Sequence, residues 1–153
     1  SDVYKRQHNW FTCKVTYGKV MENGMQKKVT EPYLVDALSF TEAEARIIEE
    51  IRPFVSGEFV VSGINRAHFG EVFLHTEGDK WYKVRISVIT LDEKSGLEKR
   101  TVMRYLVQAY TFEEACNNFK AAMSGTMMDY VIIEVSETPL MDVYPYEAEG
   151  GVK

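Results

Sequence analysis

Pairs of basic residues follow two of the turns that the sequence predicts. Lys27-Lys28 comes after one turn, Lys99-Arg100 comes after the other, and Arg104 lies close to the second pair. Lysine and arginine side chains neutralise phosphate groups, and aromatic rings beside them stack on unpaired bases. The candidate nucleic-acid contacts are therefore Lys27, Lys28, Lys99, Arg100 and Arg104. The rings expected to stack beside them are Trp10, Trp81, Tyr33 and Tyr105.

The same residues also have a purely structural explanation. Lysine beside a hairpin turn keeps the strand edge soluble and discourages pairing with another chain, and the rings can fill the core between two repeats. The formal net charge of −5 opposes attraction of the whole protein to a phosphate backbone, although a local basic patch still attracts one. Nucleic-acid binding is therefore the second hypothesis.

Few residues have the chemistry of a metal ligand or a nucleophile. His68 and His75, with Cys13 or Cys116, match no zinc spacing such as Cys-x-x-Cys or His-Glu-x-x-His. Both cysteines occupy apolar positions of a strand or helix pattern, so we expect buried free thiols. Acidic pairs such as Glu113-Glu114 are explained by helix capping and solvation. We predict no catalytic residue, no cofactor and no metal, and keep an enzyme with a site between two repeats as the third hypothesis.

Two copies of one pattern span most of the chain. Trp10-Phe11 matches Trp81-Tyr82 at the start, and Glu71-Val72-Phe73 matches Asp142-Val143-Tyr144 at the end. Such a match predicts an internal duplication, in which each copy needs the other to cover its apolar face.

Each copy opens with a predicted hairpin. In residues 11–17 every second residue is apolar, which is typical of a half-buried strand, and Asn23-Gly24 and Ser95-Gly96 suit tight turns. Pro32 indicates an edge or a bulge in the first return strand. The inward residues of the return strands are predicted to be Tyr33, Val35 and Ala37, with Tyr105, Val107 and Ala109 in the second copy.

A helix is predicted after each hairpin. Ser39 with Glu42, and Thr111 with Glu114, form capping boxes that satisfy free backbone amides. The apolar stripes expected to face the core are Ala43, Ile47 and Ile51, with Ala115, Phe119 and Met123 in the second helix.

Two further strands complete each copy, at residues 59–64 and 71–74, and at 130–135 and 142–144. The sequence thus predicts an α+β fold built by internal duplication of a ββαββ unit, with a mainly antiparallel sheet, two helices packed on it and a pseudo-twofold axis. We expect one domain over residues 9–146, with repeats 9–77 and 78–146, and a mobile polar tail at 147–153.

The first residues of the chain do not follow the pattern of either repeat. Ser-Asp-Val-Tyr-Lys-Arg-Gln resembles the translated end of an adapter used to prepare sequencing libraries, so we expect residues 1–8 to be an adapter-derived or disordered segment. No apolar run approaches the ~18 residues of a membrane span, and two free thiols suit a reducing compartment. We expect a cytoplasmic protein that does not contact the membrane.

Several segments carry a resemblance to a known family. They are Asn9-Trp10-Phe11, residues 28–37 and 39–45, Trp81-Tyr82-Lys83-Val84 and Ser136-Glu137-Thr138. Through them the chain from Asn9 to Tyr146 resembles an uncharacterised domain of unknown function from gut-associated bacteria and their phages and mobile elements. The resemblance implies no activity, ligand or cofactor.

The leading hypothesis is a small non-enzymatic binding protein of bacterial or phage origin, whose partner is an unknown protein or a second copy of the chain. An exposed edge strand in each repeat would pair across such a homodimer. The alternative is a nucleic-acid accessory protein that uses the basic residues, and its binding should weaken with salt.

Overall fold

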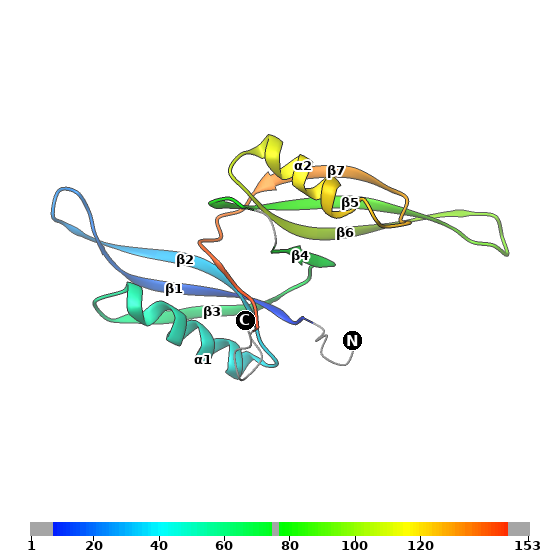
Figure 1. The fold of residues 1–153 in the computed structure, drawn as a ribbon. Coiled ribbons are helices and arrows are strands. Elements are labelled where there is room, and N and C mark those ends of the chain that lie inside the picture. Colours follow the sequence, from blue (N-terminus) through cyan, green and yellow to red (C-terminus); the bar gives the residue numbers. More distant parts are fainter. Residues whose placement is uncertain (1–7, 75–76, 147–153) are drawn as a thin grey trace. The chain divides into compact units, whose positions relative to one another are not determined.

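The structure is a computed structural model that describes residues 8–74 and 77–146 (Figure 1). The expectations for residues 1–7, for His75 and for the tail at 147–153 lie outside this range. The chain divides into two compact units. Unit 1 comprises residues 1–67 together with 140–153, and unit 2 comprises residues 68–139.

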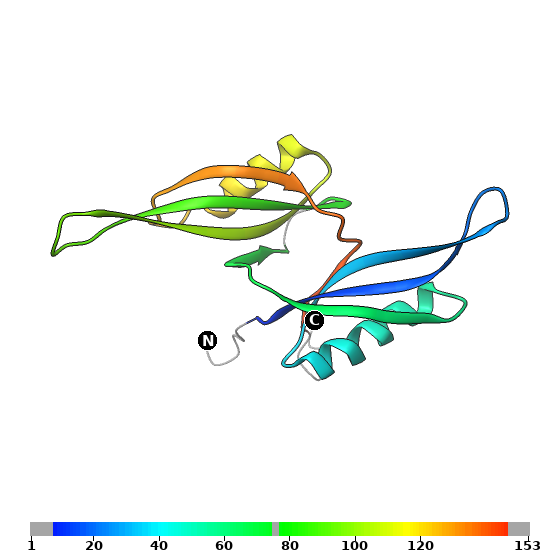
Figure 2. The ribbon, with the colours of Figure 1, turned by 180° about the vertical axis from the view of Figure 1, so that it is seen from behind.

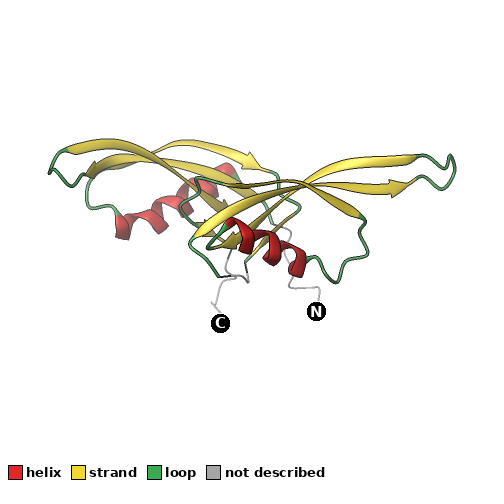
Figure 3. Ribbon diagram, turned by 90° about the horizontal axis from the view of Figure 1, so that it is seen from above, coloured by secondary structure: helices red, strands yellow, loops and turns green. Residues whose placement is uncertain are grey.

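Unit 1 is a sheet with one α-helix packed against it. Its elements are β1 (Trp10–Val20), β2 (Gln26–Asp36), α1 (Phe40–Ile51), the 3-10 helix η2 (Arg52–Phe54), β3 (Phe59–Ala67) and β8 (Val143–Tyr144). The strand order is β3-β1-β2-β8, and β8 runs parallel to β2 whereas the other pairs are antiparallel. Phe11, Val35 and Ile47 belong to the core between helix and sheet. Over the described residues of unit 1, the other face of the sheet carries no helix (Figure 3).

Unit 2 has the same kinds of elements in the same spatial order. They are β4 (Glu71–Phe73), β5 (Lys80–Leu91), β6 (Glu98–Ala109), α2 (Phe112–Ala122) and β7 (Tyr130–Glu137). The strand order is β4-β6-β5-β7, with β4 parallel to β6 and the other pairs antiparallel. Val84, Val107 and Phe119 belong to the core under α2. The described part of unit 2 likewise leaves one sheet face without a helix.

The predicted hairpins are confirmed at their turns. Gly24 and Gly96 adopt φ values of 83° and 72°, a left-handed backbone that glycine enters without steric cost. Pro32 lies within β2, two residues before Leu34, whose amide donates to Asp142 on the outer side of the strand. Backbone N–H groups point to the same side of a strand at every second residue, so the nitrogen of Pro32 also points to that outer side. The missing N–H of Pro32 therefore removes no hydrogen bond to β1.

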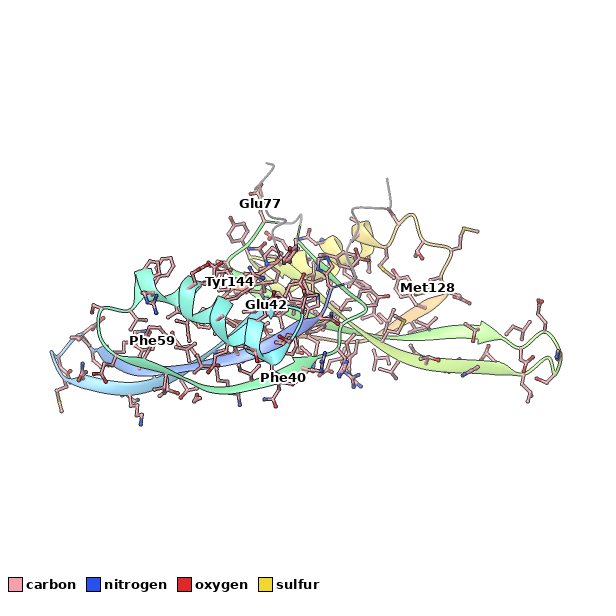
Figure 4. All side chains as sticks on the ribbon, turned by 90° about the horizontal axis from the view of Figure 1, so that it is seen from below. Phe40, Glu42, Phe59, Glu77, Met128 and Tyr144 are labelled. Carbon is pink, nitrogen blue, oxygen red and sulfur yellow. The ribbon has the colours of Figure 1, made fainter. Side chains whose placement is uncertain are left out.

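Both capping boxes form at the predicted helix starts, and Glu42 of the first one is labelled in Figure 4. The Ser39 and Thr111 hydroxyls accept from the amides of Glu42 and Glu114, each at 3.1 Å. In return the two carboxylates accept from the residues just before the caps, Leu38 and Tyr110. The predicted apolar stripes of both helices are buried, which fixes how each helix lies on its sheet.

The fourth strands differ from the sequence expectation. The ββαββ pattern assigns residues 71–74 to the first repeat, yet β4 pairs with β6 of unit 2; residues 142–144 follow the second repeat, yet β8 pairs with β2 of unit 1. Figure 2 shows the chain leaving β3 and running on into β4. The sheets therefore do not follow the predicted boundaries 9–77 and 78–146, because each sheet takes its last strand from the other half of the sequence.

The predicted α+β class with antiparallel-rich sheets is confirmed, as two separate sheets over the described residues. No helix among the described residues is long and apolar enough to cross a membrane.

Candidate functional site

The predicted basic residues of unit 1 lie on β2 but point to different faces. Lys27 is opposite Lys19, and Lys28 is opposite Gly18. Since Tyr33 and Val35 face the helix, the period of two places Lys27 on the helix side and Lys28 on the helix-free side. Both side chains are exposed, and both line an open groove of about 440 Å³.

In unit 2 the basic residues lie on β6. Arg100 and Arg104 share the helix-free face, whereas Lys99 points to the other side. Arg104 lies directly opposite Arg85, whose Nε donates to Glu134 at 2.8 Å. Arg100 pairs with Glu98 at 3.3 Å. The structure thus places Arg85, Arg100 and Arg104 on one face, with Arg104 opposite Arg85 and Arg100 further along β6, and it places Lys99 on the other face.

The aromatic residues expected to stack on bases are unsuitable for that role. Trp10 and Trp81 are each 5% exposed and Tyr105 is 4% exposed, while Tyr33 is half-buried in the core of unit 1. The expectation of base stacking by the first three is therefore wrong. Burial of large aromatic rings lowers the free energy of the folded state, so these residues stabilise the fold instead.

Both faces of unit 2 carry charged residues. The first turn of α2 carries Glu113 and Glu114. The helix-free face carries Arg85, Arg100 and Arg104 at positions set by the strand pairing. Glu134 and Glu98 lie on this same face and pair with Arg85 and Arg100, so the helix-free face combines positive and negative charge.

Exposed apolar residues lie on the same helix-free face. Val102 and Val131 are both paired with Ser87, one on either side of β5. They are 47% and 51% exposed, and Leu91 further along β5 is 67% exposed. Apolar side chains mixed with arginine are the composition found at protein interfaces. We name this surface, consisting of Arg85, Leu91, Arg100, Val102, Arg104 and Val131, the open face of unit 2.

A second candidate site was missed by the sequence analysis. Tyr17, Glu31, Tyr33 and Tyr144 line a pocket of about 290 Å³ on the helix side of unit 1. The Glu31 carboxylate accepts from the Tyr17 hydroxyl at 3.0 Å and from the Tyr33 hydroxyl at 3.4 Å. Tyr144, labelled in Figure 4, stacks on Tyr33 with ring centroids 6.0 Å apart. The signal in the sequence is Glu31 itself, an acidic residue in the inward register of Val29, Tyr33 and Val35.

The two thiols differ from each other. Cys13 is buried, as expected, and burial raises the pKa of its thiol to about 12. Cys116 is only half-buried, which corrects the expectation, because Ala115 and Phe119 occupy the inward stripe of α2. Among the described residues no three His, Cys, Asp or Glu side chains gather closely enough to hold a metal ion.

His8, the last residue of the predicted segment 1–8, lies against unit 1. Its Nδ1 contacts the Asp36 carboxylate, and its ring stacks on Trp10 with centroids 5.3 Å apart.

Comparison with known proteins gives one match. The family model described as "Domain of unknown function (DUF4494)" matches residues 9–146. The chain belongs to the DUF4494 family. This confirms the resemblance to an uncharacterised family over the expected range. No curated protein and no solved structure matches the DUF4494 chain.

Proposed function

We propose that this DUF4494 protein is a non-enzymatic binding protein, and that the open face of unit 2 contacts a partner protein. The observation that carries the proposal is the exposure of Val102 and Val131 on the two strands that flank β5, on a face that no described helix covers. Burying such side chains under a partner contributes roughly 25 cal/mol per Å² of apolar area. The arginines around them favour a partner with acidic groups near its apolar contact.

The test is capture of partners from a bacterial lysate by the tagged chain, with and without nuclease. The double variant Val102→Glu with Val131→Glu should lose a partner that the wild type retains after nuclease treatment. Met127→Glu is the matched control, because Met127 is 99% exposed and lies outside the open face. A partner captured equally by both variants would reject this surface, and a lack of any nuclease-resistant partner would reject the function.

The second candidate is a nucleic-acid accessory protein that uses Lys27, Lys28, Lys99, Arg100 and Arg104. The observation in its favour is the alignment of Arg104 with Arg85 across the two strands, with Arg100 on the same face. Changing Arg100 and Arg104 to glutamine should lower affinity for a labelled single strand, and the salt slope should fall by about 0.7 for each phosphate group that is no longer neutralised. Lys120→Gln on α2 is the control. Binding that responds to neither salt nor the arginine variants would eliminate this candidate.

Several finer expectations belong to the proposal. We infer a bacterial or phage origin and a cytoplasmic location, with a homodimer as the alternative partner. We also infer that the two units arose by internal duplication, and the support is the matching order of their elements.

A further inference from the structure

The pocket in unit 1 combines aromatic walls with negative charge. Tyr17, Tyr33 and Tyr144 supply rings, and Glu31 and Asp142 supply carboxylates. Lys19 also lines the pocket, and its ammonium group forms no ion pair with a carboxylate of the described residues. The pocket therefore has two carboxylates and one ammonium group among its lining residues.

The hydroxyl groups hold Glu31 in a fixed orientation. Both hydrogen bonds fall on Oε1, and among the described residues Oε2 accepts none. Burial raises the pKa of Tyr33 and of Tyr17, so both hydroxyls remain protonated and continue to donate at neutral pH. One carboxylate oxygen is thus held by the protein, and the other is left for a ligand.

Unit 2 provides an internal comparison for this pocket. Tyr144 pairs with Val35 on the parallel strand, two residues after Tyr33, and Phe73 pairs with Val107, two residues after Tyr105. The ring stack is retained, since Phe73 and Tyr105 lie 5.7 Å apart with an interplanar angle of 4°.

The chemistry around the stack of unit 2 is different. Two residues before Tyr105 stands Met103, at the place of Glu31, and the Tyr105 hydroxyl donates to its sulfur at 4.0 Å. Val88 takes the place of Tyr17 in the pairing with the return strand. Phe119 fills the space beside the stack, 5.3 Å from the Tyr105 ring, whereas α1 offers the smaller Ile47 to its core. Unit 2 therefore has an uncharged thioether where unit 1 has the Glu31 carboxylate, and the acidic residue near its stack is Glu71 on β4.

We propose that the pocket of unit 1 binds the alkylammonium group of a small organic cation. Ring faces attract such a cation through their quadrupoles, and the free oxygen of Glu31 provides the opposite charge. The two carboxylates outnumber the single ammonium group of Lys19 and disfavour an anion, and a purely apolar ligand would remove water from the Oε2 atom of Glu31 without replacing its hydrogen bonds. The volume of about 290 Å³ lies at the small end of ligand pockets, which suits one ammonium head group.

The experiment is calorimetric titration of the full chain with choline and with its neutral isostere 3,3-dimethylbutan-1-ol. Choline should bind at least about tenfold more tightly than the isostere, because the two differ in charge and hardly in shape. A third titration with Nα-acetyl-lysine amide distinguishes sources of the ammonium group, since tighter binding of this compound would assign the site to a lysine side chain of a partner instead.

Two variants locate the binding. Glu31→Gln keeps the shape and should weaken choline by about tenfold. Glu71→Gln is the matched control, because Glu71 is the acidic residue beside the Tyr105 stack of unit 2. Equal binding of choline and the isostere, or unchanged affinity in Glu31→Gln, would overturn the proposal. The comparison of the two ligands on the wild-type chain decides the question even where Glu31→Gln does not fold.

Discussion

The surroundings of each thiol determine its reactivity. Cys13 is buried with its pKa raised to about 12, whereas Cys116 is half-buried on α2. Because the thiolate is the reactive form, iodoacetamide should modify Cys116 first and Cys13 more than about tenfold more slowly in the folded protein. Peptide mass spectrometry over a time course measures both rates. The control is the unfolded chain in guanidinium, in which the two cysteines should react at similar rates. Similar rates in the folded protein would show that Cys13 is accessible.

The raised pKa values of one thiol and one phenol predict how stability changes at high pH. Burial raises the pKa of Cys13 to about 12, and burial with the nearby Asp142 and Glu50 charges raises that of Tyr144 to about 12. In the unfolded chain a thiol ionises near pH ~8.5 and a phenol near pH ~10, so only the unfolded state releases protons between those values and pH ~12. The contribution of these two groups to the free energy of unfolding should therefore be constant below pH ~8.5 and fall as the pH approaches ~12.

Urea titrations across the alkaline range measure this change. Tyr144→Phe should retain the ring stack and remove part of the alkaline loss. A free energy of unfolding that stays level through pH ~11, or that declines already in neutral solution, would contradict the assigned pKa directions.

At the level of single residues, the sequence predicted which side chains are buried better than which side chains lie next to each other. The inward stripe of each helix followed from spacing alone, and the structure buries it. The two adjacent basic pairs were treated as one surface, although neighbouring residues of a strand point to opposite faces. Glu31 was overlooked because strand pairing brings Tyr17 to it as a hydrogen-bond donor and brings Tyr144 to the same pocket.

At the level of elements, the start of β5 depends on one glycine. A Cβ on Gly78 would lie 2.2 Å from the backbone carbon of Ala109, and its φ of 156° is rarely adopted by other residues. Gly78→Ala should therefore lower the free energy of unfolding by about 1–3 kcal/mol, because the contacted backbone cannot turn away as a side chain would. Urea denaturation measures the loss.

Gly125→Ala is the control for that substitution in the same unit. A Cβ at Gly125 meets nothing within 4 Å, so its free energy of unfolding should stay close to that of the wild type. Equal losses in the two variants would mean that the approach of Gly78 to Ala109 is not what stabilises this strand start.

Local signals were sufficient to predict most elements but not all pairings. Alternation, turn glycines and capping residues each act over a few positions, and the hairpins and helices they predict are present. The short parallel strands β4 and β8 have no such local signal for their partners. Their pairing is decided by which open edge the chain reaches, and a repeat pattern gives the same residues for either choice.

At the level of the whole molecule, the exchanged strands make the two halves of the sequence depend on each other. Residues 8–77 lack β8, which covers the edge of β2, and residues 78–146 lack β4, which covers the edge of β6. Each half alone would expose an unpaired edge and part of its apolar core. The two fragments, expressed separately, should therefore be poorly folded or aggregated, and should regain a native spectrum when they are refolded together.

Circular dichroism and size-exclusion chromatography of the fragments, alone and mixed, measure this complementation. Val143→Asp in the second fragment should weaken it, because Val143 is 7% exposed and pairs with Leu34. Met127→Asp in the same fragment is the control, at a site that is 99% exposed. If each fragment instead folded alone with a native-like spectrum, the sheets would be complete without the exchanged strands, and β4 and β8 would be additions to units that are already stable.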